Sequence, residues 1–152
     1  MIGYVDSDYA TCKDSRRSVT GYVFYLAGGP VSWASRKQPS VTLSTTEAEF
    51  MAACAATQES LWLKMILEEL QQEVPRPMIL YEDNQACIFL ANSESNHQRA
   101  KHIHVREMFI KQHVSAGDVA FEKVDTKDNI ADLVTKALVS VTFEYLRSFL
   151  LR

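Results

Sequence analysis

The strongest constraint on the fold is a long stretch, residues 45–70, that contains neither glycine nor proline. Its composition, rich in Ala, Leu, Glu, Gln and Met, favours helix, as one long helix or two in succession. Ser44, followed three residues later by Glu47, is typical of a capping box, in which each side chain accepts a hydrogen bond from a backbone N–H at the helix start. Glu49 has no such explanation, because it lies inside the helix beside apolar residues, where burial of an unpaired carboxylate is costly. The pattern therefore predicts a core helix whose second acid needs another partner.

Hydrophobic patterns on both sides of this helix define the other elements. Before it, residues 2–10 alternate as a strand, and residues 19–37 form two β-rich runs joined at the turn signal 27–30, which predicts a hairpin. After it we expect a short buried strand at 78–85, helices at 84–93 and 99–117, a strand at 119–125, and closing helices at 128–138 and 143–151. The order β-β-β-α-β-α-α-β-α predicts an α/β domain with a mixed sheet. In such sheets, sites lie just beyond the carboxyl ends of parallel strands.

The length of 152 residues fits one domain, 1–152, with one hydrophobic core. With 47% hydrophobic and 23% charged residues, the composition is that of an ordinary soluble globular protein. No uncharged run approaches the roughly 18 apolar residues of a membrane span, and the N-terminus lacks a signal-peptide pattern. We therefore expect a cytosolic or nuclear protein without a membrane partner. A strand that begins at Ile2 favours a cut from a longer chain over a true start at Met1.

Cysteines and basic residues give weaker indications. The three cysteines, Cys12, Cys54 and Cys87, form no CxxC pair or zinc-type spacing, and we expect them to be buried reduced thiols. The net charge of −3 does not indicate a nucleic-acid-binding protein, but local basic groups can still contact phosphates. Solvated surface charge is an equally good explanation of each group. The groups are Arg16 with Arg17, Arg36 with Lys37, and Arg99 with Lys101 and Arg106.

Four acids lie at the ends of elements or on otherwise apolar faces: Asp6, Glu49, Asp83 and Asp132. Each has a simple structural explanation. Asp83 could cap the following helix, and Asp132 could complement a helix dipole. Asp6 could face solvent at a strand edge, and Glu49 could be a surface acid whose carboxylate reaches solvent, although their apolar neighbours disfavour both explanations.

Taken together, the four acids support a chemical hypothesis. Several carboxylates cannot crowd together as bare anions without repulsion and shifted pKa values, so a cluster implies bound cations. Ligands that are all oxygen select magnesium or manganese over zinc. Two such ions can hold the attacking and leaving oxygens of an in-line phosphoryl displacement. This predicts a metal-dependent nuclease or a related phosphoryl-transfer enzyme, provided that the four acids converge.

Four motifs in order, YVDSD, STTEAEFMAA, YEDNQAC and NIADLVTK, resemble the ribonuclease H domain of reverse-transcribing elements. The segments SVTGYVFYLAGGPVSWASRKQ and HQRAKHIHVREMFI look like those of copia-type LTR retrotransposons in particular. The resemblance covers nearly the whole chain. It implies the ribonuclease H-like fold, a five-stranded mixed sheet of three antiparallel strands followed by two parallel strands, flanked by helices.

The resemblance also implies an activity. Members of this family cut the RNA strand of RNA–DNA hybrids during reverse transcription, using two Mg²⁺ or Mn²⁺ ions for in-line phosphodiester hydrolysis. The family's acidic quartet corresponds to Asp6, Glu49, Asp83 and Asp132, with Asp8 as a weaker candidate for the first position. Glu49 matches the family's helical acid because one residue and then MAA follow it, which leaves the preceding glutamate as the helix cap.

Residues beside the quartet are implied in substrate binding. The hydroxyl residues before the long helix would lie near RNA 2′-hydroxyls, and the two amides after the third acid would lie near the minor groove, which is wide and shallow in such hybrids. Turn and cap chemistry explains each Ser or Thr taken singly about as well. The candidates are Ser7, Ser44, Thr45, Thr46, Asn84 and Gln85.

The chain departs from many relatives in one segment. Residues 124–132 contain neither the glycine nor the histidine of the loop that precedes the last acid elsewhere. His104 stands where an acid is expected, and we predict structural or surface roles for His97, His102, His104 and His113, because magnesium does not prefer histidine ligands. The departure motivates an alternative, a non-catalytic module that binds hybrids or scaffolds a polymerase. A third hypothesis is a nuclease of the same fold that acts on DNA.

The resemblance also implies binding partners and a cellular location. We expect an RNA–DNA hybrid and the reverse transcriptase domain of the same polyprotein as partners. The expected location is the cytoplasm, within a virus-like particle, or the nucleus.

Overall fold

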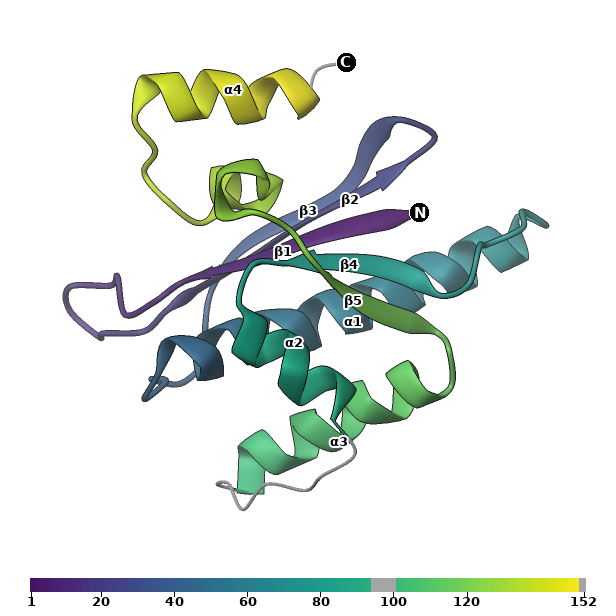
Figure 1. The fold of residues 1–152 in the computed structure, drawn as a ribbon, viewed down its shortest axis with the longest axis horizontal. Helices are drawn as coiled ribbons and strands as arrows, with labels where there is room; N and C mark the ends of the chain where they lie inside the picture. The colour runs from purple at the N-terminus through teal and green to yellow at the C-terminus, as the bar shows by residue number, and fades with distance from the viewer. Residues whose placement is uncertain (94–100, 151–152) are drawn as a thin grey trace.

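A five-stranded mixed sheet forms the centre of the fold (Figure 1). The computed structural model describes residues 1–93 and 101–150, with the side chains of these residues except 101–103. The strand order is β3-β2-β1-β4-β5. The first three strands are antiparallel, and β4 runs parallel to both β1 and β5, as predicted. The strands are β1 (Ile2–Asp8), β2 (Val19–Leu26), β3 (Gly29–Lys37), β4 (Met78–Glu82) and β5 (Val119–Lys123).

Helices cover both faces of the sheet (Figure 1). One face carries α1 (Thr45–Glu69), α2 (Gln85–Asn92) and α3 (Lys101–Ser115). The other face carries two 3₁₀ turns, η1 (Thr126–Asp128) and η2 (Ile130–Val134), and the last helix, α4 (Ser140–Leu150). The long stretch without glycine or proline is therefore one helix rather than two. None of the helices within residues 1–93 and 101–150 combines the length and apolar character that a membrane crossing needs.

Apolar side chains between the sheet and α1 form the main core. Val5 of β1, Phe24 of β2, Phe50 of α1 and Leu80 of β4 are each at most 1% exposed. Burial of such large side chains stabilises a fold by about 1.5–3 kcal/mol each relative to exposure. This core fixes α1 against β1 and β2, and thereby places the first turns of α1 beside the carboxyl end of β1.

The predicted helix at 128–138 is wrong. The chain there forms the short turns η1 and η2, and the helix expected at 143–151 begins earlier, at Ser140. A tertiary hydrogen bond explains the difference, because the buried Asn129 side chain donates from Nδ2 to the carbonyl oxygen of Val5 at 2.8 Å. The same side chain accepts from the N–H of Ala131 at 3.2 Å, so it caps η2 while it ties this segment to β1. The other element boundaries differ from the expected ones by a few residues.

Gly21 permits close packing of η2 on the sheet. It pairs with Asp6 across β1 and β2. A Cβ atom at this position would overlap Thr135 Cγ2 and lie 2.9 Å from Val134 Cγ2, which is closer than real Cβ contacts. Any side chain here requires Val134 and Thr135 to shift.

We therefore expect Gly21→Ala to lower the free energy of unfolding by about 1–3 kcal/mol, the usual cost of overpacking. Gly29→Ala is the matched control, because a Cβ there meets no atom within 4 Å. Urea unfolding of both variants measures the difference. Equal midpoints for the two variants would contradict the packing described here.

Candidate active site

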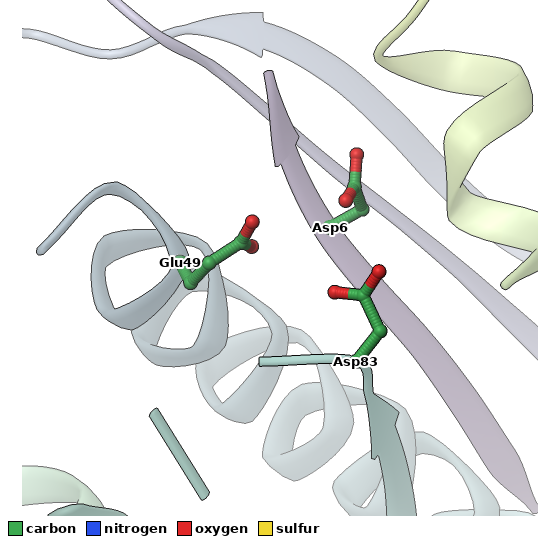
Figure 2. Close-up of side chains that lie close together, drawn as sticks. All are labelled: Asp6, Glu49 and Asp83. Carbon is green, nitrogen blue, oxygen red and sulfur yellow. The ribbon is translucent and has the colours of Figure 1, made fainter. Parts of the chain in front are cut away.

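Three of the four predicted acids meet at the carboxyl ends of neighbouring parallel strands (Figure 2). Asp6 lies near the end of β1, Asp83 directly follows β4, and Glu49 lies in the first turns of α1. One carboxylate oxygen of each lies within 4.8 Å of those of the other two. Figure 2 shows the three side chains pointing toward one another from these three elements. Parallel strands end at the same edge of a sheet, which is why acids far apart in the sequence converge here.

The environment of this trio is unfavourable for bare carboxylates. Asp6 is 0% exposed and Glu49 is 7% exposed. Burial, together with the negative charges of Glu82 and Asp6, raises the pKa of Glu49 to about 10. Glu49 Oε2 is buried without a hydrogen-bond partner among the described residues. Clustered, partly unpaired carboxylate oxygens are the ligands of a hard divalent cation, so these residues fit magnesium or manganese.

Asp132 lies close to Asp6 but is not a member of this trio. It is buried in η2, and Lys136 links it to Asp6. The Lys136 ammonium lies 2.9 Å from Asp6 Oδ1 and 2.7 Å from Asp132 Oδ1, and Thr135 Oγ1 donates to Asp6 Oδ2. Burial raises the pKa of Asp132 to about 6, although its hydrogen bond with Lys136 acts in the opposite direction. The structure therefore arranges the four acids as a trio and a lysine-bridged pair that share Asp6.

Two residues of the site were missed by the sequence reasoning. Lys136 could have been found from its spacing, because it lies four residues after Asp132 and such pairs are neighbours on one helical face. Glu82 is 0% exposed, and burial raises its pKa well above the usual range. Its Oε1 accepts from the N–H of Asn84 at 3.0 Å, which fixes the turn that carries the third acid. The alternating pattern of β4 could have indicated the burial of Glu82, since Glu82 shares a buried face with Met78 and Leu80.

The cap residues behave largely as predicted. Ser44 Oγ accepts from the N–H of Glu47 at 3.1 Å, and Glu47 Oε2 accepts from the N–H of Leu43 at 2.8 Å. The acid of the capping box thus accepts from the residue before the N-cap. Asn84, rather than Asp83, caps α2, because its Oδ1 accepts from the N–H of Cys87 at 3.0 Å.

The remaining substrate-binding candidates lie within a few positions of the trio's acids in the sequence, and they differ in solvent exposure. Thr45 and Gln85 are exposed, Thr46 is half-buried, and Ser7 is buried. Asp8, the weaker candidate, is half-buried at the end of β1 and is not a member of the trio. The exposed hydroxyl and amide groups can therefore contact a ligand without rearrangement.

Two of the three basic groups meet at one pocket. A cavity of about 280 Å³ is lined by Arg36 and Lys37 at the end of β3 and by Arg106 of α3, with Met51 and Ala55 of α1 among the other lining residues. None of the described residues that line it is acidic. Residues 99 and 100 and the side chain of residue 101 lie outside the described part of the chain. The pocket thus provides a local positive surface on a protein of negative net charge, which suits a phosphate contact.

Cys12 corrects the prediction of three buried thiols. Cys54 and Cys87 are buried, but Cys12 is partly exposed. Hydrogen bonds, first from Ser15 and then from Lys37, lower the pKa of Cys12 to about 6. Lys37 Nζ lies 3.0 Å from Cys12 Sγ. The difference arises because Cys12 lies in the connection between β1 and β2 rather than in an element that packs on the core.

His113 has a structural contact. Its Nδ1 lies 2.9 Å from Asp118 Oδ2, and its ring packs edge-on against Phe109. His104 is half-buried in α3. His97 and the side chain of His102 lie outside the described residues. The predicted structural role is thus supported by direct contacts at His113.

The sequence of the chain is similar to one segment of known transposon polyproteins. No protein-family model matches the chain. It is 40% identical over 144 residues to the retrovirus-related Pol polyprotein from transposon TNT 1-94 of Nicotiana tabacum, a match that covers 95% of the chain and 11% of the polyprotein. The corresponding polyprotein from transposon RE1 of Arabidopsis thaliana is 37% identical over 144 residues, which covers 95% of the chain and 10% of the polyprotein. The chain therefore spans about a tenth of the length of these relatives.

Solved structures give the fold. The LC11-RNase H1 isolated from compost superposes with a TM-score of 0.63 at 16% identity, and the match covers 88% of the chain and 91% of that protein. Its structure in complex with an RNA/DNA hybrid gives a TM-score of 0.62 at 16% identity, with 88% of the chain and 92% of that protein covered. The sheet order and these comparisons agree with the motif resemblance: the chain is a homologue of one segment of the retrovirus-related Pol polyproteins of copia-type transposons, and it has the ribonuclease H fold.

Proposed function

We propose that the chain is a ribonuclease H that hydrolyses the RNA strand of RNA–DNA hybrids during retrotransposon reverse transcription. The observation that carries this proposal is the convergence of Asp6, Glu49 and Asp83 from β1, α1 and the end of β4. The fold supports it, because LC11-RNase H1, which shares that fold, has been crystallised with an RNA/DNA hybrid.

In this proposal Asp6, Glu49, Asp83 and Asp132 hold two Mg²⁺ or Mn²⁺ ions. When bound, divalent ions activate a water for in-line attack and stabilise the charge that develops on the phosphate oxygens. The protein's own contribution is to hold the carboxylates in place. The core fixes α1 against β1, and Asn129 ties η2 to β1 at Val5.

The same edge of the sheet offers groups for the substrate. Ser44, Thr45 and Thr46 at the start of α1 would contact RNA 2′-hydroxyls, which distinguish RNA from DNA. Asn84 and Gln85 at the start of α2 would face the minor groove. In a polyprotein the reverse transcriptase domain would present the hybrid, in a cytoplasmic virus-like particle or in the nucleus.

The basic pocket would contact the hybrid backbone. We expect the double variant Arg36→Gln, Lys37→Gln to bind hybrid more weakly. Its slope of log affinity against log salt should be shallower than that of wild type by about 1–2, because one or two fewer phosphates are neutralised. Fluorescence anisotropy at several salt concentrations measures both quantities.

The control removes the same charge elsewhere. Lys127 in η1 is exposed, and Arg147 of α4 forms an exposed pair with Glu144. Lys127→Gln, Arg147→Gln should leave the salt slope near that of wild type. Equal slopes for both double variants would exclude a special role of the pocket.

End-labelled RNA–DNA hybrid, duplex RNA and duplex DNA test the proposed function directly. Each is incubated with the chain in magnesium, manganese or chelator, beside Asp83→Asn. The proposal predicts metal-dependent cutting of the hybrid's RNA strand alone, and no cutting by the variant. Equal cutting of duplex DNA would instead support a nuclease of the same fold that acts on DNA.

One observation favours a second candidate, a hybrid-binding module without catalysis. The segment before Asp132 contains neither glycine nor histidine, and Lys136 already forms ion pairs with both Asp6 and Asp132. This candidate predicts hybrid binding by folded protein without cutting. Repeating the assay with the reverse transcriptase domain attached separates it from an enzyme that needs its neighbour, because only the enzyme gains cutting.

A further inference from the structure

A lysine occupies one half of the carboxylate site. Lys136 follows η2, and its N–H donates to the carbonyl oxygen of Asp132 at 3.0 Å, so the backbone holds it one turn beyond that acid. Its ammonium group lies 2.9 Å from Asp6 Oδ1 and 2.7 Å from Asp132 Oδ1. The two carboxylates are nearly buried, with 0% and 7% of their side chains exposed, whereas 29% of the Lys136 side chain is exposed. The ammonium therefore lies in the position where a cation shared by these two acids would bind.

The other half of the site, formed by Asp6, Glu49 and Asp83, has no ammonium group between its carboxylates among the described residues. There Asp6, Glu49 and Asp83 bring carboxylate oxygens within 4.8 Å of one another. Glu49 Oε2 has no hydrogen-bond partner among the described residues. No lysine or arginine forms an ion pair with Glu49 or Asp83 among the pairs that the described residues form. One half is thus a set of oxygens without a bridging ammonium group, and the other half already has one.

We propose that Lys136 competes with a divalent ion for Asp6 and Asp132, so that the two ion positions of the site are unequal. The ion held by Asp6, Glu49 and Asp83 binds first and directly. The ion that uses Asp6 and Asp132 binds only when the Lys136 ammonium moves away. This inference rests on the proposed function, since it concerns the metal ions of that same site, and it makes Lys136 a positioning residue.

Physical arguments favour competition over joint binding. Two cations that share the same carboxylate oxygens repel each other, and this repulsion is strong where water is partly excluded. A hydrogen bond between an ammonium and a carboxylate is also directional, so an ion that takes the oxygen removes the bond. The flexible stem of lysine and the partial exposure of this side chain allow the ammonium to move toward solvent. Thr135 Oγ1 donates to the other oxygen of Asp6, so that carboxylate keeps its orientation meanwhile.

Calorimetric titration of the metal-free chain with Mn²⁺ tests the inference. Wild type should bind one ion tightly and a second ion more weakly. Lys136→Met keeps the apolar stem and removes the charge, and it should raise the affinity for the second ion at least about fivefold, the lower range of ordinary coupling between sites. Lys136→Arg restores the cation and should restore the weak second step.

A matched control is available at the opposite end of the sheet. Lys64 forms a part-buried ion pair with Asp118, at 2.7 Å, directly before β5. Lys64→Met removes the same charge and a similar pair, and it should leave both Mn²⁺ affinities unchanged. In chelator both methionine variants should melt below wild type, but only Lys136→Met should gain more from Mn²⁺ than wild type gains.

A second measurement uses wild type alone, in case the methionine variant does not fold. The side-chain ¹⁵N signal of Lys136 is followed by NMR during a Mg²⁺ titration. It should show its main change during the second binding step, when the ammonium leaves Asp6 and Asp132, and a smaller change during the first, because Asp6 is a ligand in both steps.

The outcomes separate the inference from the proposed function. The proposed competition is wrong if Lys136→Met binds the second ion as weakly as wild type or more weakly, or if the Lys136 signal does not change during the second step. Either result leaves the proposal of metal binding intact. If folded wild type binds no Mn²⁺ or Mg²⁺ at all, the proposed function and the inference are both overturned.

Discussion

Glu49→Gln is expected to lower cleavage of an RNA–DNA hybrid by on the order of a thousandfold, because the loss of a charged metal ligand removes several kcal/mol of transition-state stabilisation. The amide has the same shape as the carboxyl group and cannot ionise at this buried position, so folding should be retained or improved. Single-turnover cleavage of end-labelled hybrid in saturating Mg²⁺ measures the effect, and circular dichroism verifies the fold. Glu49 is 7% exposed, and one of its carboxylate oxygens lies within 4.8 Å of a carboxylate oxygen of Asp6 and of Asp83.

Glu47→Gln is the matched control, two residues away on the same helix. A glutamine at this position can still accept from the N–H of Leu43, since capping boxes use Glu or Gln. We expect cleavage within about twofold of wild type, which is less than about 0.5 kcal/mol. Loss of activity in Glu47→Gln, with activity retained in Glu49→Gln, would reverse the assignment of the two glutamates.

Stability of the metal-free chain should fall as the pH rises. The pKa of Glu49 is raised from 4.5 to about 10 by burial and then by neighbouring acids, and burial also raises the pKa values of Glu82 and Asp132. At pH values between the unfolded and the folded pKa of each of these carboxyl groups, the folded chain retains a proton that the unfolded chain has released. The folded state is therefore destabilised progressively above the unfolded pKa, by up to about 1.4 kcal/mol per pH unit for each retained proton. For one proton this amounts to about 1–3 kcal/mol between pH 5 and pH 7.

Urea unfolding in chelator at pH 5 to 8 measures this slope. Glu49→Gln removes one of the titrating groups and should flatten the curve, whereas saturating Mg²⁺ should raise stability most at the higher pH values. Asp118, whose pKa is lowered by hydrogen bonds from Lys64 and His113, affects stability only as the pH falls through its own acidic range, below this window. A metal-free stability that rises from pH 5 to 8 would contradict the account of a crowded carboxylate site.

Much of the fold follows from local patterns in the sequence. The alternation in β1, the hairpin signal and the stretch without glycine or proline each depend on neighbouring residues, and each gave the observed element. The hairpin turn has positive φ at Ala27 and Gly28, which matches the two-residue turns that join twisted strands. The prediction for the segment after β5 failed because a distant contact, from Asn129 to Val5, decides the conformation of this segment. No local pattern encodes that hydrogen bond.

The candidate site could be predicted in part for the same reason. Asp6 and Asp83 lie at the ends of strands, and the rule that parallel strands end together brings them to one edge. The bridge from Lys136 to Asp6 joins residues far apart in the chain, and it depends on how η2 packs over Gly21. The motif NIADLVTK ends on this lysine, but nothing in it indicates the contact with Asp6, because side-chain contacts of this kind require the tertiary structure.

The basic pocket, too, could not be predicted from the sequence, because it depends on contacts between distant elements. Arg36 and Arg106 belong to different elements and meet beside α1 only after the sheet and helices have packed. The sequence indicated each basic group but gave no reason to combine them. Their shared pocket became visible through the position of α3 against α1.

The most direct test of the central claim is an anomalous difference map from a crystal of the chain soaked in Mn²⁺. The account predicts a peak in contact with carboxylate oxygens of Asp6, Glu49 and Asp83, and no such peak in a crystal of Glu49→Gln at the same concentration. A well-ordered wild-type site without a peak between these three acids, at a concentration that supports cleavage in solution, would contradict the account.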